Sequence, residues 1–181
     1  MLRSADEVLN LEHLDAIAIG PGLGRRPDAT RHLNRALRSP LPLVLDADAL
    51  NLAAQDPEIA ARLAARDGPS VITPHPAEAA RLLATGTRDV QADRVAAATT
   101  LAARFKCLVA LKGAGTICAE PEGSWHVNSS GNPGLASAGT GDVLTGIIAA
   151  FLAQGIAPRT AVLLAVYLHG AAADELVRRG I

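Results

Sequence analysis

Short runs of aliphatic residues alternate with longer helical patterns along most of this chain. Residues 16–19, 43–45, 71–73 and 108–111 have the length and composition of buried strands. Helical patterns separate these runs, and parallel strands need such long crossover connections. We therefore expect an α/β fold in which a mostly parallel sheet is flanked by helices in three α/β/α layers.

The expected helices begin near residue 27 and cover stretches of 48–65, 77–83 and 90–105. Residues 116–119 and 124–127 flank a Pro-Glu-Gly turn, which predicts a β-hairpin at one sheet edge. Two helices end the chain, and the second, near 161–178, is apolar almost all round and is expected to be deeply packed. At this length we expect residues 1–181 to form a single domain.

The composition argues against several classes of function. The formal net charge is −1 and the basic residues are scattered, so we expect no nucleic-acid partner. Apolar runs stay shorter than the roughly 18 residues of a membrane span, which predicts a soluble, cytoplasmic protein. Cys107 and Cys118 form neither a disulfide framework nor a CxxC pair, so buried free thiols are expected.

Polar or glycine-rich segments follow all four expected parallel strands. Open parallel sheets bind ligands at the carboxyl ends of their strands, so these segments should converge. A further segment, GTGD, begins the first of the two final helices, where free N–H groups and the helix dipole attract an anion. The strand-end segments are GPGLG at 20–24, DAD at 46–48, TPHP at 73–76 and KGAGT at 112–116.

Each segment also has a plain structural interpretation. GPGLG fails the GxGxxG fingerprint because Arg25 replaces the last glycine, so it can be a tight turn or a backbone approach to a ligand. His75, held between two prolines, can bind a ligand or hydrogen-bond locally. Asp48 is expected to cap a helix, which leaves Asp46 freer and makes a magnesium contact there conceivable. Asp142 can be a helix-start residue or a catalytic group facing a phosphate.

Taken in order, GPGLG, DADAL, TPHPAE, LKGAGT and NSSGNPGLASAGTGDVLTGIIAAFLAQG resemble the ADP-dependent NAD(P)H-hydrate dehydratase family of the ribokinase-like superfamily. The resemblance spans residues 16 to about 174. It implies that the S-form hydrate of NADH or NADPH is dehydrated while ADP becomes AMP and phosphate. The hydroxyl would first be phosphorylated, because phosphate leaves more readily than hydroxide. Mg²⁺ would shield the phosphates.

The resemblance also implies roles for single residues. Asp142 would be the catalytic base that takes the hydroxyl proton as the oxygen attacks the β-phosphate. The hydrate would contact Gly20, Gly22, Gly24, His75 and Asp142. The nucleotide would contact Lys112, Gly113, Ala114, Gly115, Thr116, Gly139, Thr140 and Gly141. Asp46, Asn128 and Asn132 would support the site, and the magnesium ligands stay open.

Family members are commonly tetramers with small-molecule substrates, so a homo-oligomer is expected. They also carry a substantial portion before GPGLG, which this chain is expected to lack, leaving a sheet edge uncovered.

Two alternative functions stay open. A small-molecule kinase of the hydroxyethylthiazole kinase type shares the fold and a GTGD-type anion hole, and an inactive nucleotide-binding fragment is the third candidate.

Overall fold

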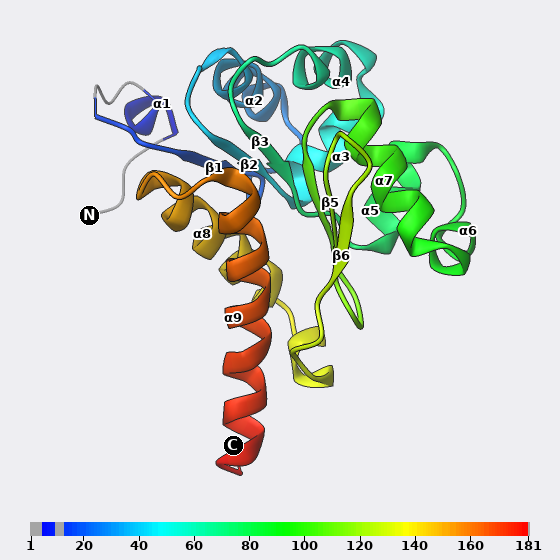
Figure 1. Ribbon diagram of the computed structural model, residues 1–181. Helices are drawn as coiled ribbons and strands as arrows, with labels where there is room; N and C mark the ends of the chain where they lie inside the picture. The colour runs from blue at the N-terminus through cyan, green and yellow to red at the C-terminus, as the bar shows by residue number, and fades with distance from the viewer. Residues whose placement is uncertain (1–4, 10–12, 181) are drawn as a thin grey trace.

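The computed structural model describes residues 5–9 and 13–180 and contains one six-stranded sheet with the order β1-β2-β3-β4-β5-β6 (Figure 1). β1 to β4 are parallel, whereas β5 and β6 are antiparallel and form the hairpin. The expected mostly parallel sheet with an added hairpin is confirmed. The strands are β1 (Ile17–Ile19), β2 (Leu43–Leu45), β3 (Ser70–Ile72), β4 (Leu108–Leu111), β5 (Ile117–Ala119) and β6 (Trp125–Val127).

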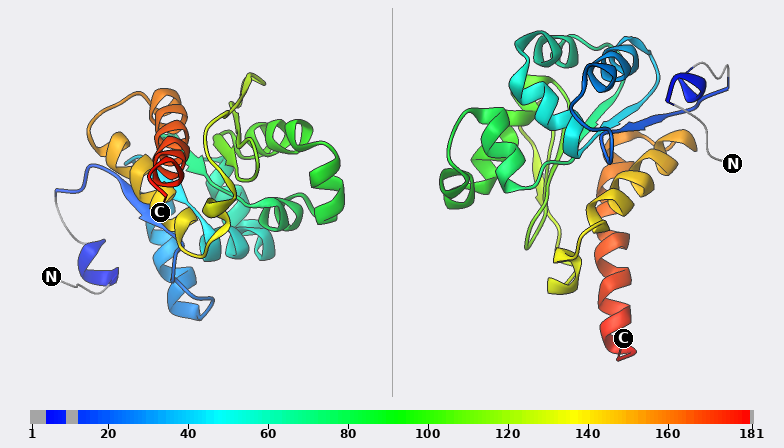
Figure 2. Two further views of the ribbon diagram at one scale, coloured as in Figure 1. Left: turned by 90° about the horizontal axis from the view of Figure 1, so that it is seen from below. Right: turned by 180° about the vertical axis from the view of Figure 1, so that it is seen from behind.

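Helices cover both faces of the sheet, with the two final helices on one side and most of the others opposite (Figure 2). A short 3₁₀ helix, η1 (Pro133–Ala136), lies between the hairpin and the final two helices. The helices are α1 (Ala5–Val8), α2 (Pro27–Arg38), α3 (Ala47–Gln55), α4 (Pro57–Ala64), α5 (Pro76–Leu83), α6 (Thr87–Ala92), α7 (Arg94–Phe105), α8 (Thr140–Ala153) and α9 (Pro158–Arg178).

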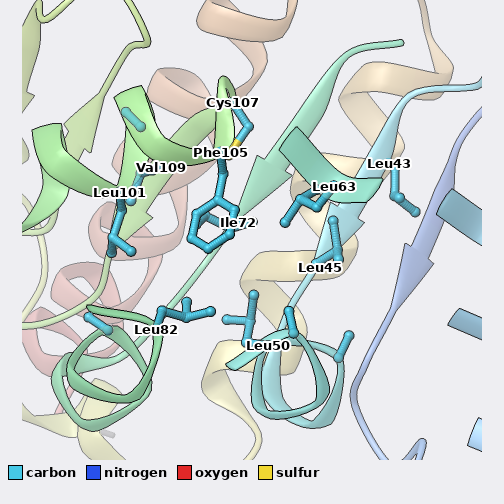
Figure 3. Packing of buried hydrophobic residues seen from close by; sticks show 14 of the residues in the cluster. Leu43, Leu45, Leu50, Leu63, Ile72, Leu82, Leu101, Phe105, Cys107 and Val109 are labelled. Carbon is cyan, nitrogen blue, oxygen red and sulfur yellow. The ribbon is translucent and has the colours of Figure 1, made fainter. Parts of the chain in front are cut away.

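The core consists of two hydrophobic clusters separated by the sheet. Neighbouring strand residues face opposite sides, so Leu43 and Leu45 join the cluster under α2 to α7, whereas Val44 joins the cluster under α8 and α9. Phe105 of α7 is fully buried in the larger cluster, and Figure 3 shows it among the labelled aliphatic side chains. Both sheet faces are therefore covered, and the three-layer arrangement is confirmed. Cys107 and Cys118 are buried free thiols, as expected.

The single helix expected over 90–105 is in fact two helices. Asp93 ends α6 and its carboxylate accepts a hydrogen bond from Ala96 N at 2.8 Å, so it is the N-cap of α7. This bond gives the Ala96 N–H an acceptor in place of the helix carbonyl that it lacks at the start of α7. The break places Arg94 at the first position of α7, directly beneath the segment that follows β4.

The expectation that α9 is deeply packed is wrong. Its first half contacts α8 and β4 through buried residues such as Val162 and Val166, but its second half extends beyond the sheet (Figure 1). Tyr167 and Val177 are 53% and 60% exposed. The sheet covers only part of the length of α9, so the apolar side chains on the rest of the helix are exposed. By length and hydropathy α9 also passes for a membrane span, but the packing of its first half is that of a core helix.

Candidate functional site

The GPGLG loop packs against the start of α3. Gly20 has a φ of +132°, and a Cβ at this position would lie 1.8 Å from the carbonyl oxygen of Asp46. Only glycine allows this approach. Gly22 and Gly24 also have positive φ values, of +65° and +75°, but open space surrounds them. The loop is thus the tight turn that one interpretation predicted, and its contact with the hydrate stays a prediction.

Asp46 caps α3, so the expectation that Asp48 does so is wrong. One oxygen of the Asp46 carboxylate accepts from Ala47 N at 2.9 Å, and the other accepts from Thr145 Oγ1 at 2.8 Å. Asp46 is only 1% exposed. Asp48 lies two residues further on, in the first turn of α3, and instead accepts from Gly24 N at 2.9 Å. Partners distant in the sequence, on α8 and after β4, decide which carboxylate turns inward.

Lys112 completes this buried group of side chains. Its ammonium lies 2.7 Å from Asp46 Oδ1, and its side chain is 20% exposed. A Cβ at Gly141 would lie 3.1 Å from Lys112 Nζ, so glycine at this position makes room for the ammonium beneath the first turn of α8. In the described part of the chain, the N–H groups of Gly141 and Asp142 donate to no acceptor. An ammonium beside free helix N–H groups is the arrangement that binds anions, so this is a candidate anion site.

A cavity of about 460 Å³ opens beside this anion site. Its polar lining brings together most of the predicted nucleotide contacts, whereas Leu135, Leu144 and Val166 give it an apolar wall. A flat apolar base could pack on such a wall without an aromatic partner. The predicted residues that line the cavity are Lys112, Gly113, Ala114, Gly115, Thr116, Asn128, Asn132, Thr140 and Gly141.

One wall of the cavity, the segment 128–136, is tied to α9. Asp174 accepts hydrogen bonds from Gly131 N at 2.8 Å and from Asn132 Nδ2 at 3.0 Å, and the Gly131 N–H is the main reason that the pKa of Asp174 is lowered. Ser130 Oγ donates to the Tyr167 carbonyl at 2.8 Å. Asn132 therefore supports the wall through Asp174, a residue that the sequence analysis missed.

His169 of α9 also lines the cavity and was missed. Burial lowers the pKa of its imidazole, and a hydrogen bond with the backbone of Thr140 partly offsets this effect. The ring is therefore neutral at neutral pH, and because Thr140 engages one ring nitrogen, the other is left to face a ligand. Its position within an apolar helix gave no sequence signal.

His75 lies outside the cavity and caps α5. Its Nδ1 accepts from Ala77 N at 3.1 Å, and Glu78 Oε2 accepts from His75 N at 2.8 Å. Because Nδ1 is an acceptor, the neutral ring carries its proton on Nε2, which lies 3.3 Å from Glu78 Oε1. The local hydrogen-bonding interpretation is confirmed. The side chain is still 46% exposed, so its contact with the hydrate stays a prediction.

Asp142 and Gly139 lie at the rim of the cavity rather than in its lining. Gly139 precedes α8 with a φ of +88°, and Asp142 is exposed in the first turn of that helix. Across residues 5–9 and 13–180, no hydrogen bond or ion pair engages the Asp142 carboxylate. Asp142 is therefore free to face a substrate bound beside the anion site.

The described residues contain no group of three His, Cys, Asp or Glu side chains that could hold a metal ion. Asp46 does not fit the conceivable magnesium contact, because Ala47, Lys112 and Thr145 already occupy its carboxylate. Mg²⁺ is often held by one or two carboxylates together with substrate phosphates and water. Phosphate oxygens of a bound nucleotide and water would therefore supply most of the magnesium ligands at this site.

Known proteins share both the sequence and the fold. The chain is 48% identical over 171 residues to the bifunctional NAD(P)H-hydrate repair enzyme Nnr of Moorella thermoacetica, covering 93% of this chain and 32% of that protein. It is 47% identical over 178 residues to the ADP-dependent (S)-NAD(P)H-hydrate dehydratase of Neisseria meningitidis, covering 97% and 60%. The chain thus spans less than two thirds of the length of these relatives.

A solved structure agrees with these relatives. The ADP/ATP-dependent NAD(P)H-hydrate dehydratase of Bacillus subtilis, co-crystallized with ATP/Mg²⁺ and soaked with CoA, superposes with a TM-score of 0.81 at 35% identity, covering 96% of this chain and 63% of that one. The fold is ribokinase-like, as expected. A family profile described as NAD(P)H-hydrate dehydratase matches residues 1–180. The chain therefore belongs to the NAD(P)H-hydrate dehydratase family.

Proposed function

We propose that this chain dehydrates the S-form hydrate of NADH or NADPH and converts ADP to AMP and phosphate. The observation that carries the proposal is the free carboxylate of Asp142 beside an anion site made by Lys112 and the first turn of α8. The family and the relative in Neisseria meningitidis support the same reaction.

The β-phosphate of ADP would bind at this anion site. An ionised carboxylate about 4 Å from a phosphate charge is repelled by about 4 kcal/mol at an effective dielectric near 20. Lys112 and the N–H groups of Gly141 and Asp142 would offset this repulsion, since the ammonium lies beside Gly141 and the two N–H groups have no protein acceptor among the described residues. The phosphate and the carboxylate can then share one site.

Asp142 would act as the base. Its carboxylate takes the proton from the hydroxyl on C6 of the nicotinamide ring as that oxygen attacks the β-phosphate and AMP leaves. The phosphorylated ring then loses phosphate from C6 and a proton from C5, which restores the double bond of NADH. Each step balances without an oxidant, and phosphate replaces hydroxide as the leaving group.

Mg²⁺ would reach the site with the phosphates of ADP, whose charge it screens when bound. The KGAGT segment would hold the remaining phosphate oxygens through backbone N–H groups, which leaves the Asp142 carboxylate free to act as the base. Gly139 and Thr140 would complete the nucleotide contacts, while Gly20, Gly22, Gly24 and His75 would bind the hydrate at the exposed side of Asp142.

The direct test is an assay of the purified chain with hydrated NADH, ADP and magnesium. We expect NADH absorbance to recover while AMP and phosphate are released in equal amounts, with ATP in place of ADP as the comparison. Phosphorylation of a thiazole alcohol without any effect on the hydrate would instead identify a small-molecule kinase. Folded protein that binds ADP but transforms neither substrate would be an inactive nucleotide-binding fragment.

We further propose that the protein is a cytoplasmic homo-oligomer, with a tetramer as the expected state. The support for self-association is a set of exposed apolar side chains on α8 and α9, an uncommon feature of a monomer surface. Light scattering during size-exclusion chromatography distinguishes a tetramer from a monomer. These side chains are Val143, Leu164, Tyr167, Leu168, Leu176 and Val177.

A further inference from the structure

Arg94 packs against the KGAGT segment but does not line the cavity. Its guanidinium donates to the carbonyl of Leu111 at 3.1 Å and to the carbonyl of Ala114, so it bridges the two ends of the turn that follows β4. A Cβ at Gly113 would lie 2.8 Å from Arg94 Nη2, and Gly113 has a φ of +147°. The turn therefore lies directly on the guanidinium.

These two hydrogen bonds also fix where the N–H groups of the turn point. The peptide bonds of the described residues are trans, and a planar trans peptide directs its carbonyl and the following N–H to opposite sides. The Leu111–Lys112 peptide follows this rule: its carbonyl meets Arg94, and its N–H donates to Pro74 O at 2.8 Å. The Ala114 carbonyl also meets Arg94, so the Gly115 N–H is directed away from Arg94.

Gly115 lines the cavity, and within the described ranges its N–H donates to no protein acceptor. Arg94 Nε is buried and lacks a partner among the described residues. A buried polar atom without a partner is rare in folded proteins. The position of the Arg94 side chain is therefore not explained by its own hydrogen bonding alone. Burial also lowers the pKa of the Arg94 guanidinium.

We propose that Arg94 is a positioning residue for nucleotide binding, which holds the Ala114 carbonyl and thereby directs the Gly115 N–H at a phosphate of a nucleoside diphosphate in the cavity. The proposal rests on the proposed function, because it takes ADP as the ligand of this cavity. Arg94 itself does not line the cavity. Its effect should therefore fall on nucleotide affinity through the shape of the turn.

The test is ADP binding to the full chain by isothermal titration calorimetry, which requires no turnover. Arg94→Ala should weaken ADP binding about tenfold, because a charge-assisted contact that orients the donor is lost. Guanidinium chloride at low millimolar concentration should restore most of this affinity in a saturable way, since the cation fits the space left by the side chain. Urea at the same concentration has a similar shape but no charge and should restore little.

Arg104→Ala is the matched control, since Arg104 lies on the same helix and also donates to a carbonyl, that of Leu82, far from the KGAGT segment. Its ADP affinity should stay within twofold of the wild type. Arg94→Lys, whose single ammonium cannot bridge two carbonyls in the same way, should also bind ADP weakly and provides the test if Arg94→Ala does not fold.

Unchanged ADP affinity in a folded Arg94→Ala or Arg94→Lys protein would overturn the positioning role. A loss that guanidinium does not restore would overturn it as well, because a general loss of structure is not repaired by the missing cation. A wild-type chain that binds no ADP would remove both this proposal and the proposed function. A wild-type chain that binds ADP but shows no turnover would remove only the proposed function.

Discussion

The ammonium of Lys112 lies 2.7 Å from the carboxylate of Asp46, which is almost completely buried. The pair joins two loops that are 66 residues apart and places a cation under the first turn of α8, beside Gly141. A buried carboxylate would be costly by itself, so each partner stabilises the charge of the other. The anion site thus depends on a residue that does not line it.

Asp46→Asn should destabilise the fold by about 2–3 kcal/mol, because it leaves the ammonium of Lys112 half-buried without a counter-charge. Urea denaturation of the wild type and the variant measures this loss. Asp48→Asn is the control: this carboxylate is more exposed and lies 3.7 Å from Arg25, so its loss should cost less than about 1 kcal/mol. Equal losses in the two variants would contradict a special role for the buried pair.

Gly170→Ala should destabilise the protein by about 1–3 kcal/mol and weaken ADP binding. A Cβ at this position would lie 2.3 Å from Ser130 Oγ and 2.7 Å from the Ser130 carbonyl, so the cavity wall must move. Gly146→Ala in α8 meets nothing within 4 Å and should instead stabilise by about 0.5–1 kcal/mol through helix propensity. Thermal unfolding and ADP titration measure the stability and ADP affinity of both variants. A Gly170→Ala protein as stable as Gly146→Ala would contradict the packing of the cavity wall on α9.

The contribution of Asp174 should depend on pH. Its pKa is lowered in the folded protein, chiefly by the Gly131 N–H and then by Asn132, so its stabilisation is present above the unfolded pKa, near 3.8, and is lost as the pH falls through the lower folded pKa. The wild type should be more stable than Asp174→Asn at pH 6. Unfolding curves at decreasing pH should show this difference shrinking. A difference that grows towards acid pH would contradict the assigned sign.

Both cysteines should resist alkylation in the native protein. Burial raises the pKa of Cys118 to about 12 and that of Cys107 further, so the thiolate, the reactive form, is scarce at pH 8. Iodoacetamide labelling followed by mass spectrometry should detect little modification of native protein at pH 8 and complete modification in urea. Rapid labelling of Cys118 without denaturant would show that the space between the sheet and α9 opens.

Much of the fold could be predicted from the sequence, because strands buried on both faces leave continuous aliphatic runs. The β4 run and the hairpin were located within a residue or two. The errors have physical causes. Asp93 can continue a helix or cap one, and only the following backbone decides which. The apolar residues of α9 predict burial, but they do not say that the sheet ends before the helix does.

The site was predictable where glycine and polar residues cluster after a strand, as at KGAGT. It was not predictable where single side chains reach across the fold. The choice between Asp46 and Asp48 depends on Lys112 and Thr145, which are 66 and 99 residues away from Asp46. Gly170 and Asp174 are one helical turn apart, so they share one face of α9. A glycine and a carboxylate on one face of an apolar helix are the signal that could have indicated a loop packed there, as Gly131 is.

The most direct test of the central claim is the single-turnover rate of NADH formation from the hydrate, with ADP and magnesium, for the wild type and Asp142→Asn. The amide keeps the shape of the side chain but cannot accept the hydroxyl proton. We therefore expect the rate to fall about a thousandfold, in the middle of the roughly 10²–10⁴-fold contribution of general-base catalysis. ADP affinity should be unchanged or slightly higher because a negative charge is removed. An Asp142→Asn protein that forms NADH at the wild-type rate would contradict the proposed role of Asp142 as the base.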